Sequence, residues 1–159
     1  MSSFNNRTKS KKKQKSAFTT NSGQRSAPKA LELFSEDYAP ILIVDDTVFN
    51  IMILSNLLQN TYNVKSDQAE SGQVAIMKCK HRIDMGQEAY RLIIMDINMP
   101  GMDGVVATKN IRGIFDPYVA ERGQKDYQIV AHTALPEDQF GNCQEKGFDA
   151  FMPKPIDSK

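Results

Sequence analysis

RLIIMDINMPGMDG, residues 91–104, contains four consecutive apolar residues, 92–95, that run directly into a carboxylate at Asp96. A continuous apolar run without polar alternation predicts a strand buried on both faces, although a short buried helix has the same pattern. The proline and two glycines between residues 100 and 104 then interrupt regular structure. Asp96 is therefore predicted to lie where a buried parallel strand ends, the edge at which open α/β sheets place their chemistry. An aspartate at this point is also a common turn residue or helix cap.

The size and composition of the chain are those of one globular domain. It has 159 residues, of which 40% are hydrophobic and 25% are charged. Its apolar runs are too short to span a bilayer, and its basic N-terminus lacks the apolar centre of a secretory signal. Cys79 and Cys143 show no metal-binding or redox spacing, which fits a reducing compartment. We therefore expect an intracellular protein without a membrane span, in the cytoplasm or, given its basic N-terminus, also in the nucleus.

Charge is distributed unevenly along the chain. Residues 1–31 hold eight lysines and arginines and no acid, so the remaining residues carry a formal charge of about −7. Residues 1–39 are predicted to form a basic, largely disordered tail in which 28–38 can form a short helix, because few apolar residues are available to offset the ordering entropy. The KKKQK run at 11–15 suits nucleic acid, an import receptor or an anionic membrane, or it only keeps an acidic domain soluble. Because no aromatic residues lie between the lysines, we expect at most non-specific contact with nucleic acid.

From residue 40 onward, apolar runs alternate with helical patterns. Strands are predicted at 41–44, 62–66, 92–96, 128–133 and 150–152, and helices at 48–58, 71–82, 103–111 and 137–146. The apolar faces are expected to include Val48, Ile51, Met52 and Leu58 in the first helix, and Val74, Ala75 and Met77 in the second. Residues 113–127 are largely polar, contain Pro117 and Gly123, and are predicted to form a long loop. The alternation implies an α/β domain over residues 40–159, with a doubly wound parallel sheet of five strands.

The predicted strands end in side chains of complementary chemistry. Asp45 and Asp46 follow the first strand, Asp96 ends the third, Thr133 ends the fourth and Lys154 follows the fifth. In a doubly wound sheet these ends share one edge, at the point where the strand order reverses. Three carboxylates there need a cation, and a few hard oxygen ligands open to water suit Mg²⁺ best. With a lysine and a hydroxyl to bind phosphoryl oxygens, one carboxylate can act as the nucleophile that forms an aspartyl phosphate.

The motifs at these strand ends resemble those of the receiver domains of two-component and phosphorelay signalling. The resemblance covers residues 41–156 and rests on IVDD at 43–46, MDINMPGMDG at 95–104, HTA at 132–134 and PKP at 153–155, in that order. The sequence is most similar to receivers that are attached to, or supplied by, hybrid histidine kinases. The resemblance implies the flavodoxin-like strand order 2-1-3-4-5.

The resemblance implies a role for each residue of the metal site. Asp96 matches the phosphoacceptor, Asp46 matches the direct Mg²⁺ ligand, and Asp45 matches the acid that helps to hold the metal. Asn98 matches the position whose backbone carbonyl completes the metal site. Its side chain would influence the access of the water that hydrolyses the phosphoryl group.

The resemblance also implies a conformational switch. Thr133 matches the hydroxyl that bonds to the phosphoryl oxygen, Lys154 matches the lysine that pairs with the phosphoryl group, and Phe151 matches the aromatic side chain that turns inward. The Lys154–Pro155 peptide bond is expected to be cis. The phosphoryl donor would be a phosphohistidine on a histidine kinase or a histidine phosphotransfer protein. Such a domain switches conformation, with only self-directed phosphotransfer and autodephosphorylation, and does not turn over a released product.

The C-terminal end departs from the family pattern. A receiver normally has a fifth helix after its fifth strand, and the chain stops at Lys159, too soon for such a helix. Apolar surface near residues 48–58 and the fifth strand would then be uncovered. We expect residues 28–38, or a partner, to cover it. The alternative is a fragment of a larger hybrid histidine kinase.

Three other functions compete with a receiver. A phosphatase-like hydrolase with an aspartyl-phosphate intermediate usually has a second acid two residues after the nucleophile, where this chain has Asn98. A degenerate receiver that serves only as a scaffold would be expected to lose the acids, threonine and lysine that are all present here. A DNA-binding protein would bind through the basic tail, and that binding would weaken with salt. His132, a lone histidine in a predicted strand, is expected to be a core residue.

Overall fold

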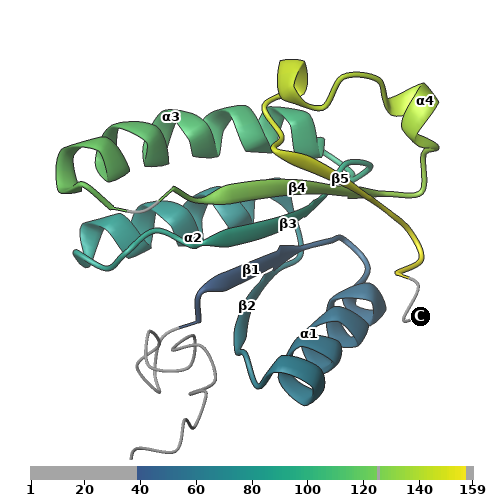
Figure 1. Cartoon of the computed structure of the whole chain (residues 1–159), viewed down its shortest axis with the longest axis horizontal. Helices are drawn as coiled ribbons and strands as arrows, with labels where there is room; N and C mark the ends of the chain where they lie inside the picture. Colours follow the sequence, from purple (N-terminus) through teal and green to yellow (C-terminus); the bar gives the residue numbers. More distant parts are fainter. Residues whose placement is uncertain (1–38, 125, 157–159) are drawn as a thin grey trace, which may run out of the picture. The chain divides into compact units, whose positions relative to one another are not determined.

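The computed structural model describes residues 39–124 and 126–156, which form a five-stranded parallel sheet (Figure 1). The strands are β1 (Ile41–Val44), β2 (Ser66–Ala69), β3 (Leu92–Asp96), β4 (Gln128–Thr133) and β5 (Ala150–Pro153). Their order in the sheet is β2-β1-β3-β4-β5, and all four neighbouring pairs are parallel. The predicted α/β fold with a doubly wound sheet in the order 2-1-3-4-5 is confirmed.

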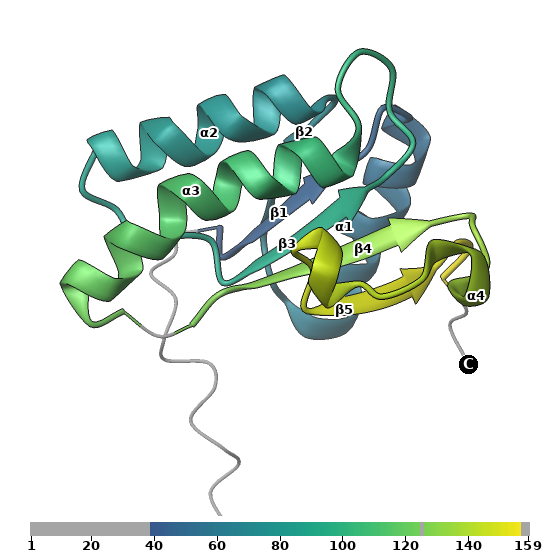
Figure 2. The same ribbon diagram turned by 90° about the horizontal axis from the view of Figure 1, so that it is seen from above.

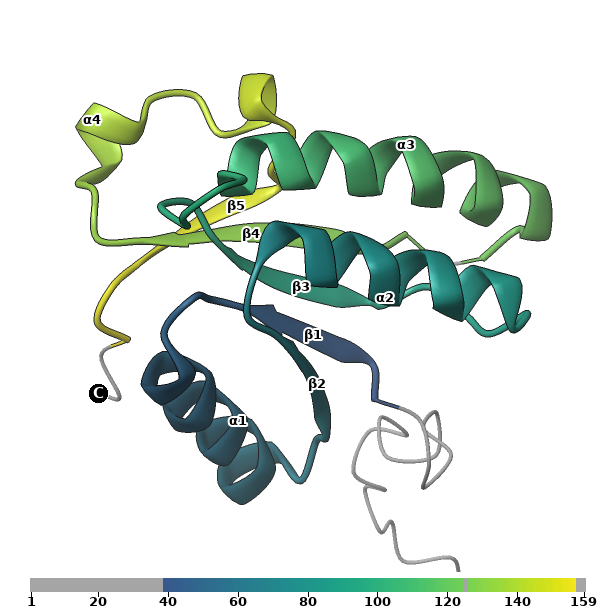
Figure 3. The same ribbon diagram turned by 180° about the vertical axis from the view of Figure 1, so that it is seen from behind.

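Helices cover the two faces of this sheet unequally. They are α1 (Val48–Tyr62), α2 (Gly72–Asp84), α3 (Gly104–Arg122), the one-turn α4 (Glu137–Phe140) and the 3-10 helix η2 (Gln144–Lys146). Figure 2 shows α2 and α3 side by side over one face, with α1 behind the sheet. Seen from behind in Figure 3, α1 lies alone below β1 and β2.

The central strands are apolar on both faces because each face packs against helices. In β3, Ile93 and Met95 belong to the large core cluster on the α2 and α3 side, whereas Ile94 belongs to a smaller cluster on the α1 side. The same alternation holds in β1, where Leu42 and Ile43 point to opposite clusters. A strand that is buried in this way has a continuous apolar sequence, as the run before Asp96 predicted.

The long loop predicted for residues 113–127 is wrong, because α3 continues through this segment to Arg122. Ile111 and Phe115 are four residues apart, lie on one side of α3 and are fully buried. Pro117 costs the helix one hydrogen bond and some steric strain. The burial of the apolar side of α3 outweighs that local cost.

Two other element boundaries also differ from the sequence-based prediction. The strand predicted at 62–66 begins only at Ser66, because α1 extends to Tyr62 and ends at Asn63, whose φ is 53°. The helix predicted at 137–146 is interrupted after Phe140 by Gly141, whose φ of 74° and ψ of −156° suit only glycine. Both boundaries are set by a left-handed or glycine-specific backbone conformation.

Three predicted core side chains are exposed instead. Val48 and Met52 are 50% and 53% exposed on α1, and Met77 is 60% exposed on α2. The buried side of α1 is formed by Ile51 and Leu54. On α2 the buried side is formed by smaller residues, which include Ala75 and Cys79. Helices packed closely on a sheet favour such small side chains at the contact.

The predicted basic tail and the short helix at 28–38 lie outside the described residues, apart from Ala39. Beyond β5, residues 154–156 form no helix. Among the residues that the structure describes, no helix combines the length and apolar character needed to cross a membrane.

Candidate functional site

The residues predicted at the strand ends lie at one edge of the sheet. Asp45 follows β1, Asp96 is the last residue of β3, Thr133 is the last residue of β4, and Lys154 follows β5. All strands are parallel, so these four positions share the carboxyl edge toward which the strand arrows point in Figures 1 and 2. β2 lies on one side of β1 and β3 lies on the other, so the strand order reverses at β1. The carboxyl edge between β1 and β3 is therefore a topological switch point.

Three carboxylates converge at this edge. One oxygen from each of Asp45, Asp46 and Asp96 lies within 4.8 Å of the others. Asp45 and Asp96 are 1% and 5% exposed, whereas Asp46 is exposed to solvent. Neighbouring buried carboxylates repel each other and lose hydration, so they need a compensating positive charge. The predicted clustering of these acids is confirmed.

Lys154 supplies positive charge to the two buried carboxylates. Its Nζ atom lies 2.7 Å from Asp45 Oδ2 and 2.8 Å from Asp96 Oδ2. Burial alone would lower the pKa of Lys154, but hydrogen bonds and charges from the two aspartates outweigh it, so that the pKa is raised. The ammonium group therefore stays charged and joins the ends of β1, β3 and β5.

Asp45 is also fixed by donors at the start of α1. The backbone N–H of Thr47 donates to Asp45 Oδ1 at 2.9 Å, and the side-chain amide of Asn50 donates to Oδ1 and Oδ2 at 3.0 and 3.2 Å. Asn50 was not among the site residues predicted from the sequence. The available signal was a polar residue in the first turn of a helix that directly follows the acid pair.

The Asp96 carboxylate is largely buried. Burial is the main cause that raises the pKa of Asp96, and the nearby charge of Asp45 adds to it, whereas the hydrogen bond and charge of Lys154 and the backbone N–H of Asn98 oppose it. That N–H donates to Asp96 Oδ1 at 3.3 Å. The net shift is upward, so this carboxylate is less stable as an anion than an ordinary aspartate.

The loop after Asp96 folds back tightly against the end of β3. A Cβ atom at Gly104 would lie 2.1 Å from the backbone oxygen of Asp96, and the Gly104 N–H donates to the Ile97 carbonyl at 2.9 Å. Asp103 caps α3 by accepting from the Val106 N–H at 2.8 Å. Only glycine fits at position 104, and this close approach sets the path of the loop that carries Asn98.

Thr133 and Lys154 lie on adjacent segments. The side chain of Thr133 is fully buried, and its Oγ1 accepts from the Leu135 N–H at 3.2 Å. The backbone N–H of Lys154 donates to the Thr133 carbonyl at 2.8 Å, so the two segments are joined. The predicted cis peptide bond between Lys154 and Pro155 is confirmed. Phe151 is half-buried, with its ring 5.4 Å from that of Phe140.

His132 is a core residue, as predicted. It is 4% exposed, and its Nε2 atom has no hydrogen-bond partner among the described residues. Burial, followed by the charge of Lys154, lowers the pKa of His132 to about 4. The ring is therefore neutral at physiological pH and does not act as a charged donor at the site.

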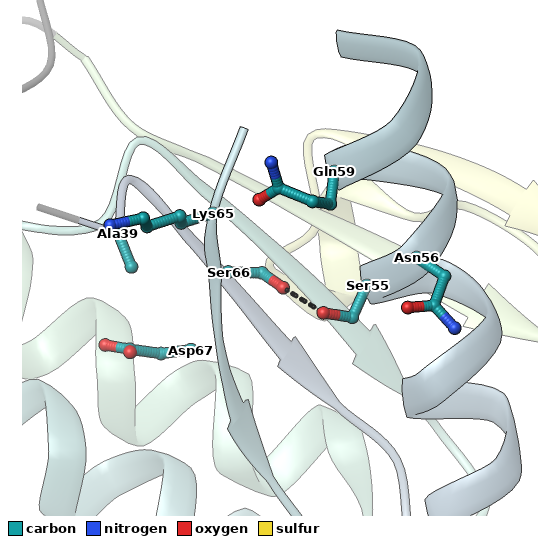
Figure 4. Close-up of a pocket in the computed structure, with 7 residues that line it drawn as sticks. All are labelled: Ala39, Ser55, Asn56, Gln59, Lys65, Ser66 and Asp67. Carbon is teal, nitrogen blue, oxygen red and sulfur yellow. Dashed lines mark hydrogen bonds between the residues drawn. The ribbon is translucent and has the colours of Figure 1, made fainter. Parts of the chain in front are cut away.

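A polar hollow away from this edge does not compete as a functional site. Its lining residues are Ala39, Ser55, Asn56, Gln59, Lys65, Ser66 and Asp67 (Figure 4). The Ser66 hydroxyl donates to Ser55 Oγ at 3.1 Å, so these two hydroxyls satisfy each other. The hollow lies between α1 and the beginnings of β1 and β2, at the opposite end of the strands from Asp96.

The sequence was compared with protein families and with individual proteins. The profile of the response regulator receiver domain matches residues 41–159. The chain is 35% identical over 118 residues to hybrid signal transduction histidine kinase M of Dictyostelium discoideum. The aligned region covers 74% of this chain and 5% of that protein. The chain is 33% identical over 120 residues to sensor protein GacS of Pseudomonas syringae pv. syringae, covering 75% of this chain and 12% of that one.

Solved structures agree with this assignment. The receiver domain of the histidine kinase CKI1 from Arabidopsis thaliana, complexed with Mg²⁺ and BeF₃⁻, is 25% identical with a TM-score of 0.59, covering 72% of this chain and 79% of that chain. The chain spans only a small part of the length of the curated kinases that it matches. With the acids, the threonine and the lysine in the expected order along one sheet edge, the chain belongs to the response regulator receiver domain family.

Proposed function

We propose that this chain is a phosphorelay receiver in which Asp96 accepts a phosphoryl group from a phosphohistidine, with Mg²⁺ bound beside it. The donor would be a histidine kinase or a histidine phosphotransfer protein. The observation that carries the proposal is the convergence of Asp45, Asp46 and Asp96 within 4.8 Å, with the Lys154 ammonium between the two buried acids. This set provides a nucleophile, oxygen ligands for a cation and a partner for the phosphoryl group in one place.

The donor set fits a magnesium ion. The proposed ligands are carboxylate oxygens of Asp45, Asp46 and Asp96, together with the backbone carbonyl of Asn98. They are all hard oxygen donors, and the exposure of Asp46 leaves room for the water ligands that Mg²⁺ prefers to keep. A bound Mg²⁺ would neutralise charge on the phosphoryl oxygens and reduce the repulsion among the carboxylates. The complex of the CKI1 receiver with Mg²⁺ and BeF₃⁻ supports this choice of cation.

In the proposed transfer, a carboxylate oxygen of Asp96 attacks the phosphorus atom of the phosphohistidine. A P–O bond forms, the P–N bond breaks, and its electron pair remains on the imidazole nitrogen of the donor. Lys154 would then exchange its contact with the Asp96 oxygen for one with a phosphoryl oxygen, and the Thr133 hydroxyl would bond to another. Both side chains would be drawn toward the new charge, which is nearly −2.

The same site would limit the lifetime of the signal. Water attack on the aspartyl phosphate would return Asp96 to a carboxylate, and the exposed side chain of Asn98, two residues after Asp96, would influence the access of this water. The proposed role is thus self-directed phosphotransfer and autodephosphorylation, with rearrangement of Thr133 and Phe151 as the output. We infer a location in the cytoplasm or the nucleus, where such donors act.

An exposed apolar patch beside the site supports a protein as the phosphoryl donor. Val48, Phe49, Met52 and Ile53 are 50%, 67%, 53% and 49% exposed and occupy the first turns of α1, immediately after the acid pair. We call these four residues the α1 patch. Clusters of exposed apolar side chains are typical of protein interaction surfaces. A phosphohistidine presented by a protein would bring such a surface to the site.

The test is phosphorylation by acetyl phosphate or phosphoramidate, with and without Mg²⁺, read by intact mass. Wild type should gain one phosphoryl group only with Mg²⁺, and Asp96→Asn should gain none. Asp84→Asn, which removes an exposed acid at the end of α2, is the matched control and should behave like wild type. A folded wild-type protein that gains nothing would instead support the scaffold function, in which the acids are present but inactive.

A further inference from the structure

The Asp45 carboxylate accepts more hydrogen bonds than either of the other two acids in the cluster. Its Oδ1 atom accepts from the Thr47 backbone N–H at 2.9 Å and from the Asn50 amide at 3.0 Å. Its Oδ2 atom accepts from the same amide at 3.2 Å and from the Lys154 ammonium at 2.7 Å. An ionised carboxylate has about four lone-pair positions. The donors around Asp45 therefore occupy about as many positions as this carboxylate has.

The other two acids keep more of their lone pairs available. Asp96 accepts from the Asn98 N–H at Oδ1, 3.3 Å away, and from Lys154 at Oδ2, 2.8 Å away. Asp46 is exposed, and the donor beside it within the described chain is the Thr47 hydroxyl, at the long distance of 3.5 Å. Asp46 and Asp96 can therefore offer lone pairs to a cation, whereas Asp45 must first give up a hydrogen bond.

We propose that Asn50 is a positioning residue that keeps Asp45 from binding the cation directly and thereby makes the acid cluster selective for Mg²⁺ over Ca²⁺. The inference rests on the proposed function, in which a magnesium ion binds at this cluster. It narrows the part of Asp45 in that ligand set to a contact through water. The direct protein ligands would then be the carboxylates of Asp46 and Asp96 and the backbone carbonyl of Asn98.

A small number of direct protein ligands favours the smaller cation. Mg²⁺ takes about six ligands and gives up its water reluctantly, so a site that supplies few protein oxygens suits it. Ca²⁺ takes about six to eight oxygens and readily accepts both oxygens of a carboxylate. If Asp45 were free to turn toward the cation, it would add a third carboxylate to the direct ligands. That addition should strengthen the binding of Ca²⁺ far more than the binding of Mg²⁺.

Among the donors to Asp45, Asn50 is the one whose removal changes this carboxylate selectively. The Thr47 donor is a backbone N–H, and Lys154 also contacts Asp96. In the described part of the chain, the hydrogen bonds of the Asn50 side chain go to Asp45 alone. The backbone N–H of Asn50 donates to the Thr47 carbonyl at 2.9 Å, and alanine keeps this bond. Because alanine is the best helix former, Asn50→Ala should leave α1 intact.

Cation titrations of the full chain test the proposal. The ¹⁵N-labelled protein is titrated with MgCl₂ and, separately, with CaCl₂, and amide chemical shifts measured by NMR give a Kd for each cation. Asn50→Ala should bind Ca²⁺ about tenfold more tightly than wild type, whereas its Kd for Mg²⁺ should change by less than about twofold. Asn56→Ala removes an exposed amide further along the same helix and is the matched control. It should keep the wild-type ratio of the two Kd values.

A second substitution assigns the effect to Asp45. Asp45→Asn is made in wild type and in Asn50→Ala, and in its presence Asn50→Ala should no longer change the ratio of the two Kd values. On its own, Asp45→Asn should weaken the binding of Mg²⁺ without abolishing it, since a ligand that acts through water is lost. The same spectra verify that each variant is folded.

The outcomes separate this inference from the proposed function. If Asn50 has only a structural role, Asn50→Ala raises both Kd values by the same factor, and the unchanged ratio overturns the inference. A change in the ratio that persists with Asp45→Asn, or a complete loss of binding in Asp45→Asn alone, overturns it as well. If wild type binds no Mg²⁺ at the acid cluster, the proposed function fails and the inference fails with it.

Discussion

Lys154 holds together three strand ends by contacting two buried carboxylates at once. Its Nζ atom lies within 2.8 Å of an oxygen of Asp45 and of Asp96, and its side chain is 17% exposed. A divalent cation at the acid cluster would also compensate the negative charge of these two carboxylates. The ammonium group and the metal are therefore expected to substitute for each other in stabilising the folded state.

We expect Lys154→Met to lower the free energy of unfolding by about 3 kcal/mol in the absence of metal, because two buried carboxylates lose their counter-charge. Adding Mg²⁺ should restore more stability to this variant than it adds to wild type. Urea unfolding with and without Mg²⁺ measures both effects. Lys80→Met, at an exposed position of α2, is the control and should show the wild-type response. An equal gain from Mg²⁺ in wild type and Lys154→Met would contradict the substitution of one charge by the other.

His132 predicts a distinct dependence of stability on pH. Its pKa is lowered from the ordinary value of 6.5 to about 4, because burial and the charge of Lys154 oppose protonation in the folded state. Between these values the unfolded chain binds the proton and the folded chain does not. Stability is therefore lost as the pH falls from 6.5 to 4, by at most about 3 kcal/mol.

His132→Leu should remove this part of the acid-induced loss of stability. The difference in unfolding free energy between wild type and the variant, measured from pH 7 to 4, isolates the histidine from Asp96, whose raised pKa acts in the opposite direction. Gln73→Leu, a substitution without a titratable group at an exposed position of α2, provides the control and should leave the wild-type profile unchanged. Parallel profiles for wild type and His132→Leu would show that the buried ring does not set the pH response.

At the level of elements, the sequence predicted those whose hydrophobic pattern is continuous and missed those decided by tertiary packing. β1, β3 and β4 have the bounds that the sequence predicted for them. Pro117 and Gly123 suggested a loop, yet Phe115 is buried against Tyr90 and Tyr127, and this packing keeps α3 intact beyond the proline. Local propensity cannot report contacts with residues that are distant in the sequence.

The site residues also divide into those that the sequence predicted and those that depend on tertiary packing. Asp45, Asp96, Thr133 and Lys154 could be placed together because parallel strands bring their carboxyl ends to one edge. Asn50 could not be placed at the site from the sequence, since its contact with Asp45 depends on the angle between β1 and α1. The order of the elements can be predicted from the sequence, whereas a contact between a helix side chain and a site residue depends on how the elements are oriented.

On the scale of the described molecule, the two sides of the sheet have different roles. The side covered by α2 and α3 holds the large core cluster, which includes Phe115, Phe140 and Phe148, and stabilises the fold. The other side has the smaller core and, on the outer surface of α1, the α1 patch. Most of the exposed large apolar side chains in the described part of the chain therefore lie on α1, whose first turn is next to the acid cluster.

This arrangement predicts that a protein donor and a small-molecule donor respond differently to a change in the α1 patch. Phe49 is 67% exposed, and Phe49→Ala removes apolar contact area without touching Asp45, Asp46 or Asp96. Transfer from a phosphorylated histidine phosphotransfer protein should slow roughly tenfold, the effect of losing about 1.4 kcal/mol of contact energy. Labelling by acetyl phosphate should remain at the wild-type rate. Met77→Ala removes a side chain of similar exposure, 60%, from α2 on the far side of the sheet, and should affect neither reaction. A matching loss for Phe49→Ala with both donors would place the defect in the phosphoryl site, and a matching loss for Met77→Ala would move the docking surface to α2.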